Sequence, residues 1–191
     1  MDLLNRDMIL YLQQFLTNEE TNNFISNKYI NDILKHSRVY TTRVTYDHLH
    51  KIEDLKLVRE LECSRSMITE LPRTYNLVYL DCSYTKISEI PQLDNLVHLD
   101  CCLTGVTSIP YLPNLKYLNC SNTKVVDIPI LEKLEVLECF NSKVTTIDQP
   151  NVGMLNCALC TSLKEIKTPE VYLLEQSGCY SLKKILIRST N

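Results

Sequence analysis

The 191-residue sequence contains only three glycines, no tryptophan and four scattered histidines. A loop that cradles phosphate needs several glycines so that its backbone N–H groups can approach the ligand, and neither the G-x-G-x-x-G nor the P-loop pattern occurs. No Ser, His and Asp set stands in the context of a catalytic motif. We therefore expect a protein that is not an enzyme, with no catalytic residues, no metal ligands and no cofactor.

Excess positive charge and long apolar runs are also lacking. The chain has 20 Lys and Arg against 23 Asp and Glu, whereas a nucleic-acid-binding domain usually has a basic surface. No uncharged apolar run approaches the roughly 18 residues that a membrane span needs, and charges interrupt the place where a signal peptide has its apolar core. We expect no nucleic-acid partner, no membrane contact, and a location in the cytoplasm, or in the cytoplasm or nucleus of a host cell. The nine cysteines are then expected to be free thiols.

A cysteine recurs at a nearly constant interval through the chain. The column consists of Cys63, Cys82, Cys101, Cys120 and Cys139, each 19 residues after the last, and Cys157 after 18 more. These cysteines belong to a template, L-x-x-L-x-C-x-x-T-x-I-x-x-I-P, with seven copies of which the outer ones are looser. A fixed period near 20 residues is typical of a solenoid, in which each repeat forms one coil stacked on the next.

We number the positions of each copy from its first leucine, so that the cysteine is at position 6. Positions 4 and 6 are apolar and alternate with polar positions, which indicates a short strand with one buried face. After position 15 only about four residues remain before the next strand, too few for an α-helix, and the proline there fixes an extended φ. The expected fold class is an α/β solenoid, with one parallel sheet on its concave face, a convex side of turns and extended chain, and a small three-helix cap at the N-terminus.

The template resembles the leucine-rich repeat family, whose pattern is L-x-x-L-x-L-x-x-N-x-L or a variant ending in C-x-x-L. The first five copies have Ser or Thr in place of the asparagine, and their hydroxyls are expected to bond backbone groups at the turn. The last two follow the variant with Cys160 and Cys179. Counting 19 residues back from Val58 gives a degenerate copy with Thr42 at position 4. The solenoid is thus expected over 38–191, with one degenerate repeat and seven repeats of 18–19 residues.

Residues 1–37 depart from this period and show helical patterns. The run from Met8 to Leu12 would surround a helix with apolar side chains, which requires burial on two sides. A capping box at Thr17 to Glu20 begins a second helix, and the apolar residues of 29–34 indicate a third. Three short helices before a leucine-rich solenoid resemble an F-box, although Asn5 stands where that family has proline.

The resemblance implies a substrate-recognition adaptor of a cullin-type ubiquitin ligase. The residues expected to bind a Skp1-like adaptor are Leu4, Met8, Ile9, Leu12 and Leu16. The alternative is a stand-alone binding, inhibitor or scaffold protein, in which these helices only cap the first coil of the solenoid.

Side chains at positions 3, 5, 7 and 8 are expected to face outward on the concave side. Position 5 is an acid or an amide in all seven copies, and position 3 is rich in tyrosine and apolar residues. An acidic column beside an aromatic one suits a protein target with a basic or mixed surface. The expected partner-binding residues are Tyr79, Asp81, Tyr84, His98, Asp100, Tyr117, Glu138 and Phe140.

Two further expectations concern single places in the chain. The last coil ends in Ile185, Leu186 and Ile187 with no evident cap, and an unpaired sheet edge there could recruit a second copy as a homodimer. Cys102 lies at the outward position 7 and is expected to be the most reactive thiol.

Overall fold

The computed structural model describes residues 43–45, 58–72 and 76–187. These residues form a solenoid of about seven coils, in which eleven strands of three residues each occur and no helix. It follows that none of the described residues belongs to a helix able to span a membrane. The expected helical cap at 1–37, with its adaptor-binding residues Leu4, Met8, Ile9, Leu12 and Leu16, lies outside the described residues.

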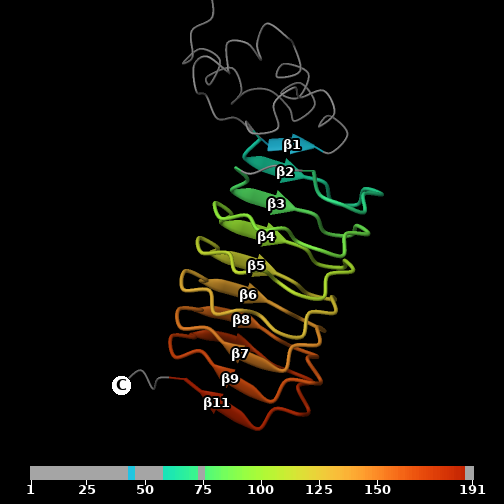
Figure 1. Ribbon diagram of the computed structural model, residues 1–191. Coiled ribbons are helices and arrows are strands. Elements are labelled where there is room, and N and C mark those ends of the chain that lie inside the picture. Colours follow the sequence, from blue (N-terminus) through green and yellow to red (C-terminus); the bar gives the residue numbers. More distant parts are fainter. Residues whose placement is uncertain (1–42, 46–57, 73–75, 188–191) are drawn as a thin grey trace, which may run out of the picture.

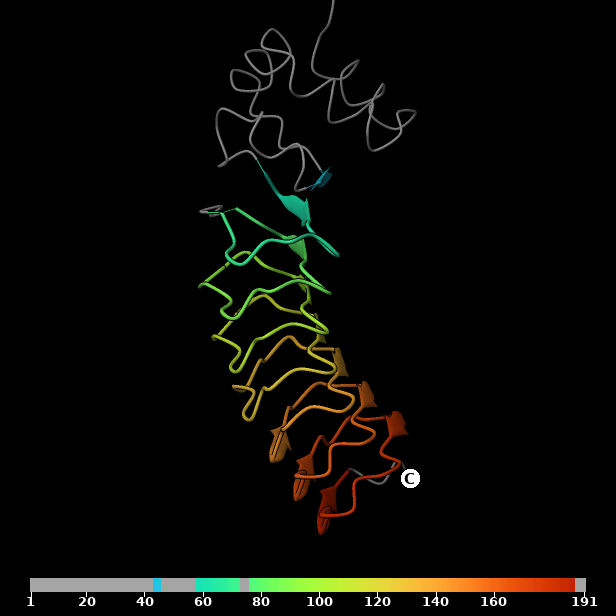
Figure 2. The same ribbon diagram turned by 90° about the vertical axis from the view of Figure 1, so that its right-hand side faces the viewer.

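Eight strands, one from the degenerate repeat and one from each of the seven copies, form a larger parallel sheet. They are β1 (Arg43–Thr45), β2 (Glu60–Glu62), β3 (Tyr79–Asp81), β4 (His98–Asp100), β5 (Tyr117–Asn119), β6 (Val136–Glu138), β8 (Met154–Asn156) and β10 (Leu173–Glu175). Figure 1 shows the coils stacked one upon another along the sheet. The stack bends gently toward this sheet (Figure 2), whose outer surface is therefore the concave face.

The register of the larger sheet follows the repeat. Leu80 pairs with Leu99, and Leu99 with Leu118, so that position 4 stays in line. The degenerate repeat differs, because Val44 and not Thr42 pairs with Leu61. The prediction that the degenerate repeat keeps the 19-residue spacing was therefore wrong by two residues.

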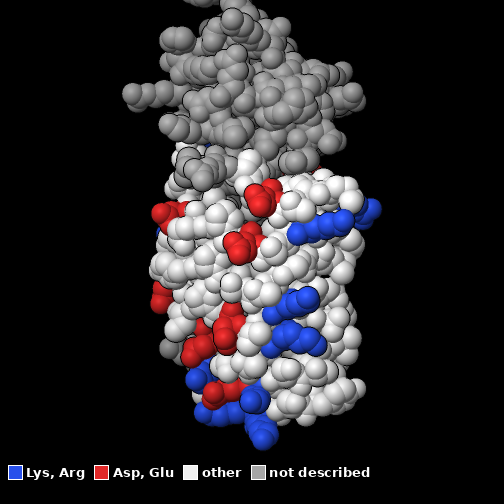
Figure 3. Space-filling model, turned by 45° about the vertical axis from the view of Figure 1, so that its right-hand side comes forward, with Lys and Arg blue, Asp and Glu red and all other residues white. Residues whose placement is uncertain are grey.

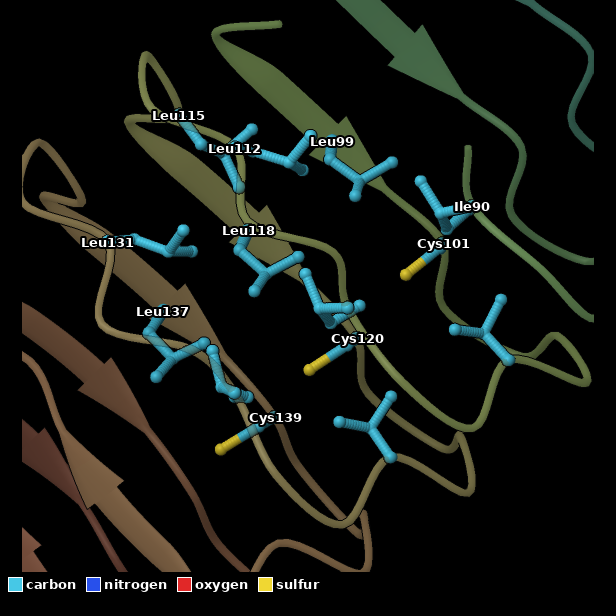
Figure 4. Packing of buried hydrophobic residues seen from close by; sticks show 14 of the residues in the cluster. Ile90, Leu99, Cys101, Leu112, Leu115, Leu118, Cys120, Leu131, Leu137 and Cys139 are labelled. Carbon is cyan, nitrogen blue, oxygen red and sulfur yellow. The ribbon is translucent and has the colours of Figure 1, made fainter. Parts of the chain in front are cut away.

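Inside the coils, the position-4 leucines and the cysteine column form a continuous core. Leu80, Cys82, Leu99 and Cys101 have no exposed surface, and Figure 4 shows Cys101, Cys120 and Cys139 in line within the stack. The Cys82 thiol also donates to the backbone oxygen of Asp100 in the next coil, at 3.4 Å. The cysteines thus act as small apolar side chains that add a weak hydrogen bond between coils.

The hydroxyl column behaves as the sequence predicts. Thr85 Oγ1 donates to the oxygen of Cys82 at 2.7 Å, and Thr123 Oγ1 to that of Cys120 at 2.6 Å. In the sixth coil a thiol replaces the hydroxyl, and Cys160 Sγ donates to the oxygen of Cys139 one coil earlier, at 2.9 Å. The C-x-x-C pair at 157–160 is therefore part of the core.

The convex side carries a second, smaller sheet that the sequence analysis did not predict. It consists of β7 (Thr146–Asp148), β9 (Glu165–Lys167) and β11 (Lys184–Leu186), all parallel. In the earlier coils a proline such as Pro110 or Pro129 follows the inward isoleucine, whereas Asp148, Lys167 and Leu186 follow it here. Proline has no N–H to donate to a ladder. The second sheet therefore begins where the prolines end.

Candidate functional site

The concave face presents the side chains on either side of each buried leucine. In β3 to β6 and in β8 the central residue is buried and both neighbours are half-buried. Positions 3 and 5 therefore face outward, as predicted. Position 7 was also predicted to face outward, but it does not do so in every coil, because Ser83, Ser121 and Ala158 are buried. The small side chains at position 7 are thus covered by the surrounding chain, whereas Phe140 and Cys102 at the same position are half-buried.

Three aromatic rings stack along position 3. The Tyr79 and His98 rings have centroids 4.4 Å apart with an angle of 13° between their planes, and His98 and Tyr117 follow at 4.2 Å and 2°. The Tyr117 hydroxyl donates to Glu138 Oε1 at 2.9 Å, which joins the aromatic column to the acidic one. Burial, followed by this bond, raises the pKa of Tyr117, so the phenol stays a protonated donor.

The acidic column has a structural task as well as a charge. Asp81 Oδ1 accepts the backbone N–H of Ser83, and Asp100 Oδ1 that of Cys102, both at 2.9 Å. Asn119 Oδ1 accepts from the residue two positions on in the same way, at 3.1 Å. These are Asx turns that end the strand. The Asn119 amide also donates to Asp100 Oδ2 at 3.2 Å, which links neighbouring coils.

Position 8 is held in the left-handed region of backbone space. The residues there with positive φ, between 51° and 58°, are Arg65, Tyr84, Leu103, Asn122, Asn141 and Leu159, and Gly178 follows at 74°. Glycine and asparagine tolerate this conformation, whereas bulky side chains cost about 1–2 kcal/mol. The asparagines and Gly178 at this position were the signal from which the turn could have been predicted.

An apolar ridge follows the same position along the rim of the concave face. Tyr84 is 51% exposed, and Leu103 and Leu159 are each 42% exposed. The Arg65 guanidinium carbon lies 5.1 Å from the Tyr84 ring centroid, a cation–π contact that fixes the first of these side chains. Stability alone would favour asparagine or glycine at these places. At Tyr84, Leu103 and Leu159 the chain instead combines a positive φ with an exposed bulky side chain.

The structure brings together most of the predicted partner-binding residues. Tyr79, His98 and Tyr117 form the stack, and Glu138 is bonded to its end. Asp81, Asp100, Tyr84 and Phe140 lie on the same face or its rim, but no contact between side chains of these four is found among the described residues. The predicted set omits the linking Asn119 and the ridge residues Leu103 and Leu159.

Charges outside the concave face are arranged differently. Figure 3 looks obliquely at the side where the strands of the larger sheet end. Basic and acidic side chains lie in separate groups over the middle of the stack and are mixed at its lower end. Lys86, Lys124 and Lys143 occupy equivalent places in three coils and are exposed. They follow the position-8 turn and so lie beyond the ridge. The concave face thus carries acidic groups, and exposed lysines lie past its rim.

Residues 113–151, which span the fourth and fifth copies, match a family model described as leucine-rich repeats, in two copies. The match supports a leucine-rich repeat protein. No curated protein matches the chain. Leucine-rich repeats suggest a module for protein–protein interaction.

The described part of the chain offers no other obvious site. No group of three or more His, Cys, Asp or Glu among these residues could hold a metal ion. Cys102 is half-buried, and burial together with the charge of Asp100 raises its pKa to about 12. The expectation that Cys102 is a reactive thiol was wrong, because reactivity requires the thiolate.

Proposed function

We propose that the chain is a leucine-rich repeat module that binds a basic segment of a protein partner on its concave face. The observation that carries the proposal is the stack of Tyr79, His98 and Tyr117 beside the acidic column. Stacked rings are already held in place before binding, so less conformational entropy is lost when a partner docks. Arginine side chains in particular favour nearby carboxylates, to which the guanidinium can donate two parallel hydrogen bonds.

The carboxylates can hold their turns and bind a partner at the same time. Each carboxylate oxygen has two lone pairs, and Asp81 Oδ1 and Asp100 Oδ1 each accept one backbone hydrogen bond. Successive coils are about 4.8 Å apart. An extended basic segment that runs along the stack would therefore meet a ring in each of three successive coils and a carboxylate, Asp81 or Asp100, in the first two of them.

Binding should be tested with peptides because the target is unidentified. Fluorescence anisotropy would compare arginine- and lysine-rich peptides with acidic peptides of the same length. We expect the basic peptides to bind and the acidic ones not to. Tyr79→Ala should weaken binding by about tenfold, as expected for an aromatic anchor. If the protein binds both kinds of peptide equally, or neither, the proposal fails.

Asp81→Asn and Asp100→Asn are the sharper variants for this experiment. Asn119 shows that an amide oxygen makes the same turn, so these changes remove charge while keeping the turn. Asp100→Asn also loses the bond from the Asn119 amide to Asp100 Oδ2, so Asp81→Asn is the cleaner of the two. We expect each variant to bind basic peptides more weakly, and its binding to depend less on salt concentration. Lys124→Ala, beyond the rim, is the control that should leave affinity unchanged.

A more specific role is proposed on the sequence alone. The resemblance of residues 4–34 to an F-box supports a substrate-recognition adaptor of a cullin-type ubiquitin ligase, acting in the cytoplasm. A pull-down with a Skp1-like adaptor tests it, and Ile9→Asp and Leu12→Asp should abolish capture while thermal unfolding of the solenoid is unchanged. If the unaltered protein does not capture the adaptor, the stand-alone binding module remains. The peptide experiment is independent of this result.

A further inference from the structure

The C-terminal end of the solenoid exposes a cross-section of its core. β10 and β11 are the outermost strands of the two sheets, and no strand of the described residues pairs with their outer edges. Ile185 in β11 is 38% exposed, whereas Ile166, its counterpart one coil earlier, is fully buried. Leu174 and Leu182 are likewise only partly buried. We call this surface the open end.

The open end also contains a polar group that lacks a partner. Gln176 stands in the seventh coil at the position that cysteine occupies in the others. Its Oε1 atom is buried and has no hydrogen-bond partner within the described residues. Gln176 lines a hollow of about 400 Å³ together with Cys179, Leu182 and Lys184. A buried amide oxygen of this kind normally accepts a hydrogen bond, so the hollow suits an occupant that brings a donor.

We propose that the occupant is a second copy of this chain, with β10 of each copy paired antiparallel to β11 of the other. Centring the pair on Leu174 and Ile185 aligns the three-residue strands fully. Leu173 then meets Leu186, and Glu175 meets Lys184. The apolar residues and the opposite charges match in this single register, and each antiparallel pair of opposite charges or apolar side chains stabilises a sheet. All four outward side chains are exposed in the single chain.

The shape of the open end favours the same arrangement. β10 and β11 belong to opposite sides of one coil, so the chain runs through them in opposite directions, and β11 extends farther along the stack than β10 (Figure 2). A two-fold axis parallel to the strands sets the protruding β11 of each copy against the recessed β10 of the other. An axis perpendicular to the sheets would instead oppose the two protruding strands and leave the recessed ones apart.

This contact closes on itself. The same surface is used by both copies, so the assembly stops at a dimer and does not grow into a filament. A two-fold axis parallel to the strands turns the larger sheet of one copy to the opposite side from that of the other. The two concave faces therefore point away from each other, and the dimer offers two separate partner sites.

Sedimentation equilibrium of the full chain over a wide range of concentrations tests the proposal. We expect a reversible monomer–dimer equilibrium. Leu173→Asp should weaken it strongly, because an aspartate would face Leu186 across the new pair. Glu175→Lys and Lys184→Glu should each weaken the dimer by about tenfold or more. Lys143→Glu, which alters an exposed charge in an inner coil away from the open end, is the control. Circular dichroism and thermal unfolding would verify that each variant is folded.

The decisive measurement is the combined variant Glu175→Lys with Lys184→Glu. If these residues face each other across the dimer, exchanging the charges restores association lost in either single variant. Lys184 also lies 2.7 Å from Glu165 of its own chain, so Glu165→Gln is included in both the single and the combined variants. A folded combined variant that does not regain association overturns the proposed register. The proposal as a whole is overturned if the chain stays monomeric at every concentration. It is also overturned if the chain dimerises but none of these substitutions alters the monomer–dimer equilibrium.

Discussion

At the scale of single residues, the position-8 turn shows a conflict between stability and exposed bulk. Tyr84, Leu103 and Leu159 all have positive φ, between 52° and 58°. Asn122 and Asn141 fit the same backbone with less strain, and Asn141 Nδ2 donates to Asn122 Oδ1 at 2.9 Å. Asparagines at position 8 can therefore form a hydrogen-bonded ladder along the stack, but only Asn122 and Asn141 do so. The apolar residues interrupt it on the rim of the concave face.

We expect Leu103→Asn to raise the free energy of unfolding by about 0.5–1 kcal/mol, because it relieves the strain of a bulky side chain at positive φ. The new amide would stand next to Asn122 and could extend the ladder. Chemical denaturation measures the effect. Val126→Asn is the matched control, since Val126 is 43% exposed but is not among the residues with positive φ. A loss of stability on Leu103→Asn as large as in the control would contradict the strain argument.

The thiol of Cys102 gives a pH prediction. Its pKa is raised to about 12 by burial and by the neighbouring Asp100 carboxylate, against an ordinary value near 8.5. The thiolate fraction at neutral pH is therefore very small. We expect alkylation of the folded protein by iodoacetamide to be slow at pH 8 and to rise about tenfold per pH unit well beyond the ordinary thiol range. Asp100→Asn should speed the reaction at fixed pH. Rapid labelling of Cys102 at pH 7, read by peptide mass spectrometry, would refute this.

At the scale of elements, one residue type decides where the second sheet forms. Within the described residues, strands occur on the convex side only where proline no longer follows the inward isoleucine. β9 is the central strand of this sheet, with β7 and β11 on either side. Lys167 lies in β9 and pairs in register with Asp148. A proline in such a central strand removes a ladder donor.

Lys167→Pro should therefore lower the free energy of unfolding by about 1–3 kcal/mol. Lys167 also lies 3.5 Å from Asp148 Oδ2 and 3.4 Å from Glu165 Oε2, and exposed pairs of this kind contribute at most about 1 kcal/mol. Lys167→Ala removes the ion pairs while keeping the N–H, and so separates the two effects. Equal losses in both variants would show that the backbone donor does not matter.

The sequence could predict those features that depend on period and alternation alone. Spacing of 18–19 residues aligned Leu80, Leu99 and Leu118 correctly, and alternation placed Tyr79 and Asp81 on the outer face. It could not predict the ring stack, because the ring planes depend on the conformation that neighbouring coils impose. The left-handed turn was missed although Asn122, Asn141 and Gly178 at position 8 indicate it. The register of β1 also escaped prediction, since the chain between β1 and β2 is two residues shorter than the period.

At the scale of the whole molecule, stability should depend on the place of a residue along the stack. Each coil contacts only its neighbours, so an inner coil is supported on two sides and the last coil on one. Leu118 in β5 has no exposed surface, whereas Leu174 in β10 lies at the open end and is only partly buried. The same substitution at these two equivalent positions therefore tests the contribution of neighbouring coils.

We expect Leu118→Ala to cost about 2–5 kcal/mol, as for a fully buried leucine that leaves a cavity. Leu174→Ala should cost about 1 kcal/mol in the monomer, because part of its surface already meets water. Urea unfolding at low protein concentration measures both. Repeating it at high concentration adds a second comparison, since a partner seated on the open end would bury Leu174 and raise the cost of its truncation, while that of Leu118 stays the same. Equal costs at the two positions would mean that the last coil is already covered in the single chain.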